Sequence, residues 1–193
     1  MKTYIIASTC LLFTIASAAQ KAPFRIRTVQ MFGEFSMNSK IKTATEEIKA
    51  PIMDFGINST FGGKSLGMYI EGNYKSRKLS GLPGATLKSI GSIEGYLGLR
   101  YFPVKPTIMA GKMAIRPTFG AAYGIDFTLS SKADFTNYGG LVFAGFTFTP
   151  ITSLNGFFVN VVYRTDEATA VGYQYQPYAS IRAGILFGPS ANK

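Results

Sequence analysis

Apolar and polar side chains alternate along most of the chain after about residue 25. This alternation has a period of two, which is typical of β-strands because successive side chains of a strand point to opposite faces. Helical spacing of 3.6 residues organises none of these runs. The pattern predicts eight strands, at Ile26–Met37, Met53–Phe61, Ser65–Ser76, Gly91–Phe102, Ile115–Thr128, Tyr138–Thr149, Phe157–Arg164 and Tyr175–Phe187.

The segment from Asn137 to Tyr163 contains no charged residue, which is also a feature of membrane-spanning helices. Pro150 and the Asn155-Gly156 pair interrupt it, and it is rich in Thr, Val and Phe. These residues favour two strands joined by a turn over a helix.

The connections between the predicted strands alternate in length. Short connections are predicted at Gly62–Lys64, Pro103–Thr107 and Pro150–Gly156. Long polar connections are predicted at Ser39–Pro51, Arg77–Ile90, Leu129–Asn137 and Thr165–Gln174.

The first 18 residues have the features of a secretory signal peptide. Lys2 gives a positive start, the run from Tyr4 to Ala16 is mostly apolar, and Ala16-Ser17-Ala18 offers a small-x-small cleavage site. An uncleaved N-terminal anchor is the alternative. We therefore expect a signal peptide at residues 1–18 and a single domain at residues 19–193, with strands from about residue 25 to residue 187.

Composition narrows the possible chemistry. The chain of 193 residues is 47% hydrophobic and 16% charged, which excludes an ordinary disordered protein. It has no His, and Cys10 in the leader is its one Cys. We expect no disulfide, no metal site and no cofactor, because the usual soft metal ligands and redox thiols are missing.

A strand with one fully apolar face must keep that face away from water. A soluble sandwich or barrel buries the apolar face in its core, whereas a membrane barrel turns it outward to lipid and keeps the polar face inside. Ionised residues at mid-strand and the alternation of short and long connections favour the membrane barrel. The sequence predicts an all-β, eight-stranded antiparallel up-and-down transmembrane barrel with short periplasmic turns and longer extracellular loops.

Two stretches carry a family resemblance. Ile115–Phe127 (IRPTFGAAYGIDF) and Tyr178–Phe187 (YASIRAGILF) resemble strands of the small eight-stranded outer-membrane barrels of Gram-negative bacteria, the OmpA/OmpX-like family in the broad sense. The chain departs from the family's terminal aromatic residue, because six residues, Gly188 to Lys193, follow Phe187. The resemblance implies the bacterial outer membrane as location and says little about function.

The inward faces of the predicted strands carry balanced charges. We expect an interior ion network of Glu34, Asp54, Glu71, Glu94, Asp126, Arg100, Arg116, Arg164 and Arg182, with Lys75 as a fifth base. Counting from the turns places Glu71, Glu94 and Arg116 at similar height, and Glu34 near Arg182. Arg77 belongs to the bases of the long loops, and Arg27 to a basic rim at the short-turn end.

The enzymes among the outer-membrane barrels that this chain resembles use a His general base, and this chain has no His. The sequence therefore predicts a non-enzymatic barrel with a structural or surface-interaction role, such as adhesion or envelope integrity. Its expected partners are outer-membrane lipid or lipopolysaccharide and surface proteins that meet the long loops; nucleic acid is not expected. A narrow pore for small solutes and a soluble exported barrel for a lipophile are the alternatives.

Export is testable at the N-terminus. The Ala16-x-Ala18 spacing predicts cleavage after Ala18 or Ala19, so the first residue of the mature protein is Ala19 or Gln20. N-terminal sequencing of the protein from the cell envelope checks this, and a sequence beginning at Met1 contradicts it.

Overall fold

The computed structural model describes residues 26–42, 47–62, 65–78, 89–103, 105–129, 136–165, 169–170 and 173–188. The predicted signal peptide at residues 1–18 lies outside these residues, as do the loop acids Glu46, Asp134, Asp166 and Glu167. Within the described residues no helix is long and apolar enough to cross a membrane.

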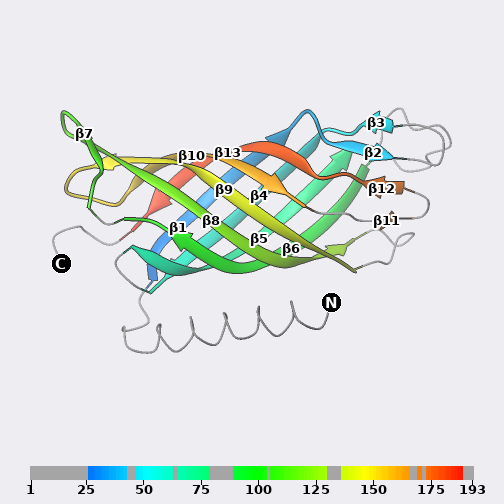
Figure 1. The fold of residues 1–193 in the computed structure, drawn as a ribbon, viewed down its shortest axis with the longest axis horizontal. Coiled ribbons are helices and arrows are strands. Elements are labelled where there is room, and N and C mark those ends of the chain that lie inside the picture. The colour runs from blue at the N-terminus through cyan, green and yellow to red at the C-terminus, as the bar shows by residue number, and fades with distance from the viewer. Residues whose placement is uncertain are drawn as a thin grey trace, which may run out of the picture.

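Eight long strands form the body of the molecule, and Figure 1 shows their arrangement. Each has one apolar and one polar face, as the alternation of the sequence predicts. They are β1 (Ile26–Ser36), β4 (Ile52–Phe61), β5 (Leu66–Lys78), β6 (Ser89–Tyr101), β8 (Met113–Thr128), β9 (Thr136–Pro150), β10 (Gly156–Arg164) and β13 (Tyr178–Phe187).

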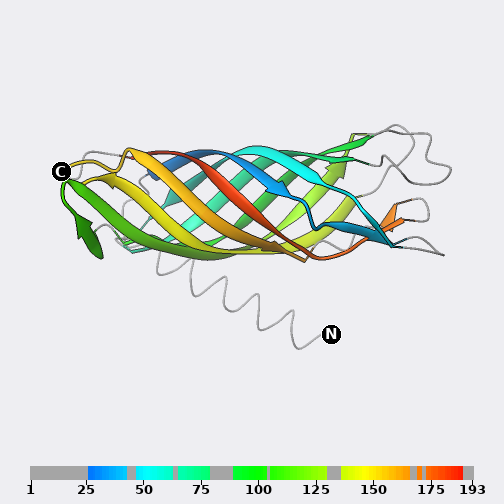
Figure 2. The same cartoon turned by 90° about the horizontal axis from the view of Figure 1, so that it is seen from above.

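These strands close into one antiparallel barrel. The order around it is β1-β4-β5-β6-β8-β9-β10-β13, and β13 pairs with β1 to complete the ring. Figure 2 shows the strands crossing the length of the barrel at a tilt. The predicted all-β, eight-stranded, antiparallel up-and-down barrel is confirmed. Gly62 and Asn155 lie at the same end of the barrel, which we call the turn end. We call the opposite end the loop end.

The turn end contains one element that the sequence did not predict. The short strand β7 (Ile108–Ala110) pairs with the beginning of β8. The connection between the long strands β6 and β8 is therefore longer than the expected Pro103–Thr107. Gly111 forms the tight turn between β7 and β8 with a φ of 60°, and Gly62 has a φ of 104° in the turn after β4. A positive φ favours glycine because a Cβ would clash there.

The loop end contains a second sheet. Two predicted long connections hold short strands: β2 (Lys40–Lys42) and β3 (Glu47–Lys49) follow β1, and β11 (Thr169–Ala170) and β12 (Tyr173–Tyr175) precede β13. These four pair in the order β11-β12-β2-β3 and extend the wall beyond the barrel. The predicted strand Tyr175–Phe187 is consequently broken at Gln176 and Pro177.

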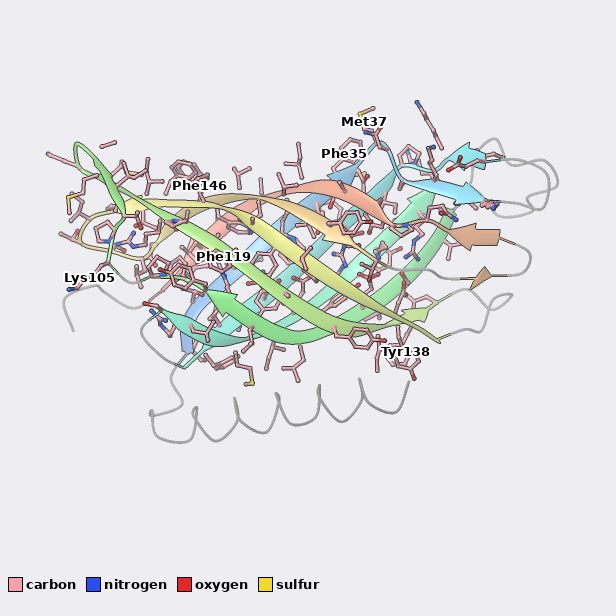
Figure 3. All side chains as sticks on the ribbon, in the orientation of Figure 1. Phe35, Met37, Lys105, Phe119, Tyr138 and Phe146 are labelled. Atoms are coloured by element: carbon pink, nitrogen blue, oxygen red, sulfur yellow. The ribbon has the colours of Figure 1, made fainter. Side chains whose placement is uncertain are left out.

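Burial alternates along every long strand, but the polarity is opposite to that of a soluble protein. The inward side chains are mostly polar or charged and almost fully buried, whereas large apolar side chains cover the outside (Figure 3). Leu97 is 52% exposed and Ile70 is 41% exposed, while the neighbouring Tyr96 and Glu71 are 4% and 2% exposed. The apolar surface of the barrel therefore faces outward.

Candidate functional site

A cluster of charged side chains fills the barrel interior toward the loop end. Its members come from seven of the eight long strands, and none is more than 4% exposed. We call it the acid–base cluster; it comprises Glu34, Asp54, Glu71, Glu94 and Asp126 with Lys75, Arg77, Arg164 and Arg182. Five carboxylates thus face four bases.

Arg164 of β10 is the centre of this cluster. Its guanidinium donates to Glu34 at 2.9 Å and to Glu94 at 2.8 Å. The Nη2 atom lies 3.2 Å from Asp54 and 3.6 Å from Glu71. One guanidinium with five donors thereby contacts four carboxylates on four strands, which a point-charge ammonium does less well.

Arg182 of β13 joins the seam where the barrel closes. It lies directly opposite Glu34 of β1 in the ladder, and its Nη2 is 2.6 Å from Glu34 Oε2. It also holds Glu71 in a two-pronged pair, with Nη1 at 2.6 Å and Nη2 at 2.9 Å from the carboxylate oxygens. The hydroxyl of Tyr69 donates to the same Glu71, and the ring of Phe32 lies 3.9 Å from Arg182 Cζ.

The outer part of the cluster lies on β5, β6 and β8. Lys75 forms a salt bridge with Glu94, and Asn73 donates to Glu94 at 2.9 Å. Arg77 donates to Asp126 through Nη1 and Nη2, each at 3.2 Å. Because Arg77 also lies 3.9 Å from Glu94, the cluster is continuous across these strands.

Arg77 corrects the expected distribution of charge. It was expected among the bases of the long loops, but it is 1% exposed inside the barrel. Its inward position follows from alternation: Tyr69, Glu71, Asn73, Lys75 and Arg77 are successive inward residues of β5, which runs two residues beyond the expected end at Ser76. Extending the predicted strand by one residue beyond Ser76, with the same alternation, places Arg77 on the inward face.

Arg27 is a second correction. It was expected on a basic rim, yet it is 8% exposed. The pairing of β1 with β4 shifts between Ile26 and Thr28, and this irregularity turns both Arg27 and Thr28 inward. A β-bulge of this kind has no reliable signature in a single sequence.

Two predicted members of the network lie outside the acid–base cluster. Arg116 hydrogen-bonds to Thr149, and Arg100 donates to Thr118 at 2.9 Å and to Thr60 at 3.4 Å. The structure therefore does not place Arg116 beside Glu71 and Glu94, as counting from the turns suggested. The tilt of the strands makes equal counts correspond to different heights.

Apolar side chains fill much of the remaining interior. Tyr69, Tyr96, Ala122, Leu141, Phe143 and Val162 pack together near the acid–base cluster. Phe32, Phe102, Leu154, Phe158 and Leu186 pack together toward the turn end. Both groups occupy the space that an open lumen would need.

The interior offers little reactive chemistry. Among the described residues no group of three or more His, Cys, Asp or Glu side chains is arranged to hold a metal ion. The carboxylates are engaged by guanidinium and ammonium groups, which is an arrangement for charge neutralisation. It links strands that are distant in the sequence, because Arg182 and Glu71 are 111 residues apart.

Comparison with solved structures gives the same fold. Neisserial surface protein A (NspA) matches with a TM-score of 0.54 at 13% sequence identity, over 84% of this chain and 96% of that chain. The attachment invasion locus protein Ail of Yersinia pestis matches at 15% identity and a TM-score of 0.38, over 83% of this chain and 99% of Ail. Ail in complex with the heparin analogue sucrose octasulfate matches at 14% identity and a TM-score of 0.40, over 84% and 99%.

The NspA match carries the structural likeness, and at this identity it shows the shared fold. It agrees with the barrel architecture that the family resemblance implied. No family model matches the sequence, and no curated protein matches it.

The central position of Arg164 predicts a large effect of its removal. In Arg164→Met, four buried carboxylates lose a common donor, and we expect the free energy of unfolding to fall by about 3–5 kcal/mol. Lys112→Met, at an exposed turn-end position, removes the same kind of charge and should change it by less than about 0.5 kcal/mol. Denaturant unfolding of the two refolded variants measures both values. Equal unfolding midpoints for the two variants would show that Arg164 does not stabilise the barrel.

Proposed function

We propose that this chain is a non-enzymatic integral protein of the bacterial outer membrane, with a structural or surface-interaction role. The observation that carries the proposal is the reversed polarity of the barrel: charges are buried and large apolar side chains are exposed. A soluble protein rarely exposes contiguous apolar surface of more than a few hundred Å². Here every long strand of the barrel contributes exposed large apolar side chains to the outer surface.

The dimensions of the strands fit a bilayer. A tilted transmembrane strand needs about 9–11 residues, and the eight long strands have between 9 and 16. Aromatic side chains lie toward both ends of the apolar surface, with Phe119 and Phe146 toward the turn end and Phe35 and Tyr138 toward the loop end (Figure 3). Aromatic girdles at both interfaces are a general feature of membrane barrels.

The β2–β3 hairpin offers contacts for anionic headgroups. Lys40 lies opposite Lys49 and Lys42 opposite Glu47, so these four side chains share one face, while Ile41 on the other face is fully buried. Lys49 is in phase with the outward Met53 four residues later, which puts the face about 13 Å beyond that residue on the outer wall. Three lysines and one glutamate at this height suit the phosphates of lipopolysaccharide.

The alternatives fit the interior less well. A solute pore needs a continuous lumen, whereas eight strands leave little space and apolar clusters occupy much of it. A soluble lipophile carrier needs an apolar interior, whereas this interior holds five carboxylates and several guanidinium groups. The surface role is supported further by the resemblance in fold to NspA, a Neisserial surface protein.

The direct test probes the outward face at Leu97. Leu97→Cys is made in a Cys10→Ser background, so a fluorophore labels position 97 alone. In liposomes we expect a lipid-soluble quencher to reach the label and a water-soluble quencher not to reach it. A label at Lys112→Cys, exposed at the turn end, should show the reverse. Quenching of position 97 by the water-soluble reagent would contradict the membrane assignment.

A matched pair of arginine substitutions tests the depth of the two positions. Leu97 and Met109 are both exposed, at 52% and 64%, but Leu97 lies within the apolar surface and Met109 on β7 beyond it. In a bilayer, Leu97→Arg should cost about 2–4 kcal/mol and Met109→Arg about 0–1 kcal/mol. Unfolding by urea in lipid vesicles measures the difference, and equal costs would place both residues in water.

A further inference from the structure

The interior between the acid–base cluster and the turn end contains a second polar group, which we call the polar floor. It consists of Thr28, Gln30, Asn58, Thr60 and Arg100, each no more than 2% exposed. Thr28 lies opposite Thr60, and Gln30 opposite Asn58, on the inward face of the β1–β4 ladder. Side chains directly opposite in such a ladder have Cβ atoms about 5 Å apart, so the four form one contiguous patch.

Arg100 reaches this patch from β6. Its Nη1 donates to Thr60 at 3.4 Å, its Nε donates to Thr118 at 2.9 Å, and its Cζ lies 5.1 Å from the ring of Phe102. Among the contacts of the described residues it has no carboxylate, in contrast to Arg164 and Arg182. Its Nη2 is buried and has no hydrogen-bond partner among the described residues.

Three other residues of the polar floor also have buried polar atoms without a partner. Thr28 Oγ1, Gln30 Nε2 and both amide atoms of Asn58 are buried and lack partners among the described side chains and backbone. A buried guanidinium without an anion and several unpaired polar atoms within one patch are costly together. The chemistry of the patch therefore calls for a small guest that accepts hydrogen bonds and carries negative charge.

The neighbouring acid does not supply that charge. Glu71 lies opposite Asn58, but its two oxygens are held by Arg182 and by the hydroxyl of Tyr69. The other carboxylates of the acid–base cluster lie on the loop side of Arg164 and Arg182 or are bound by them. None of these carboxylates therefore contacts the guanidinium of Arg100 directly.

We propose that the polar floor is a binding site for a small monovalent anion of halide size. Arg100 Nη2 supplies the charge, the amide groups of Gln30 and Asn58 donate hydrogen bonds, and the Thr28 hydroxyl completes the shell with any accompanying water. The site is inside the barrel and independent of the outward apolar surface. The proposal for this site can therefore be tested independently of the membrane assignment.

The test uses the refolded full barrel and bromide as the probe. In crystals grown with sodium bromide, we expect an anomalous peak within hydrogen-bond distance of Arg100 Nη2. In solution, bromide replacing gluconate at constant ionic strength should raise the unfolding midpoint, and once the bromide concentration exceeds the dissociation constant, each tenfold rise in bromide increases the folding equilibrium constant about tenfold.

Two variants separate the site from general salt effects. Gln30→Leu keeps Arg100 and should weaken the bromide response, and Arg100→Gln should abolish it. Lys105→Gln, exposed at the turn end, should keep it. If Arg100→Gln does not fold, the wild-type crystals and Gln30→Leu still decide. Water alone at Arg100 Nη2, bromide only at surface lysines, or equal midpoints in bromide and gluconate would overturn the proposal.

Discussion

The need to neutralise charge in a closed interior governs this barrel. Eight strands leave room for side chains but little for bulk water, so the carboxylates inside the barrel are neutralised by bases on other strands. Arg164 meets this need most fully, because it contacts Glu34, Asp54, Glu71 and Glu94 at once. Such contacts also fix which strands face each other, since removing one partner leaves the others buried and uncompensated.

The alternation of apolar and polar residues is sufficient to predict the strands, but it contains only part of the information about the interior. A period of two assigns each residue to a face, so the inward positions of Glu34 and Glu71 follow from the pattern alone. Height along the barrel does not, because tilt and stagger shift each strand against the next. For this reason Glu34 and Arg182, on paired strands, were expected together and lie together, whereas Arg116 lies near Thr149 instead. Arg27 was missed because a break in register changes the phase without leaving a mark in the sequence.

The two halves of the interior differ in charge. The acid–base cluster has five carboxylates and four bases, whereas the described part of the turn half holds Arg27, Arg100 and Arg116 and no buried acid. Carboxylates therefore gather under the loops, and guanidinium groups gather beside the apolar residues toward the turns. This polarity along the axis is built by positions on β1, β6 and β8 that alternation treats as equivalent. The inward face of a single strand thus contacts a charged environment near the loop end and a more apolar one near the turn end.

The outer wall changes character where β1 passes into β2. Odd residues from Val29 to Met37 face outward, but beyond Asn38 the exposed residues are Lys40 and Lys42. The pairing Ser36 with Ile52 and Lys40 with Lys49 shows why: one extra residue is inserted on the β1 side between the two pairs. This bulge leaves β3 and β4 in phase, so Lys49 and Met53 share the outward side. The wall therefore passes from methionine and phenylalanine to lysine within a few residues, at the point where the barrel sheet ends and the second sheet begins. A membrane barrel needs such a sharp boundary, because hydrocarbon excludes lysine and the headgroups beside it attract lysine.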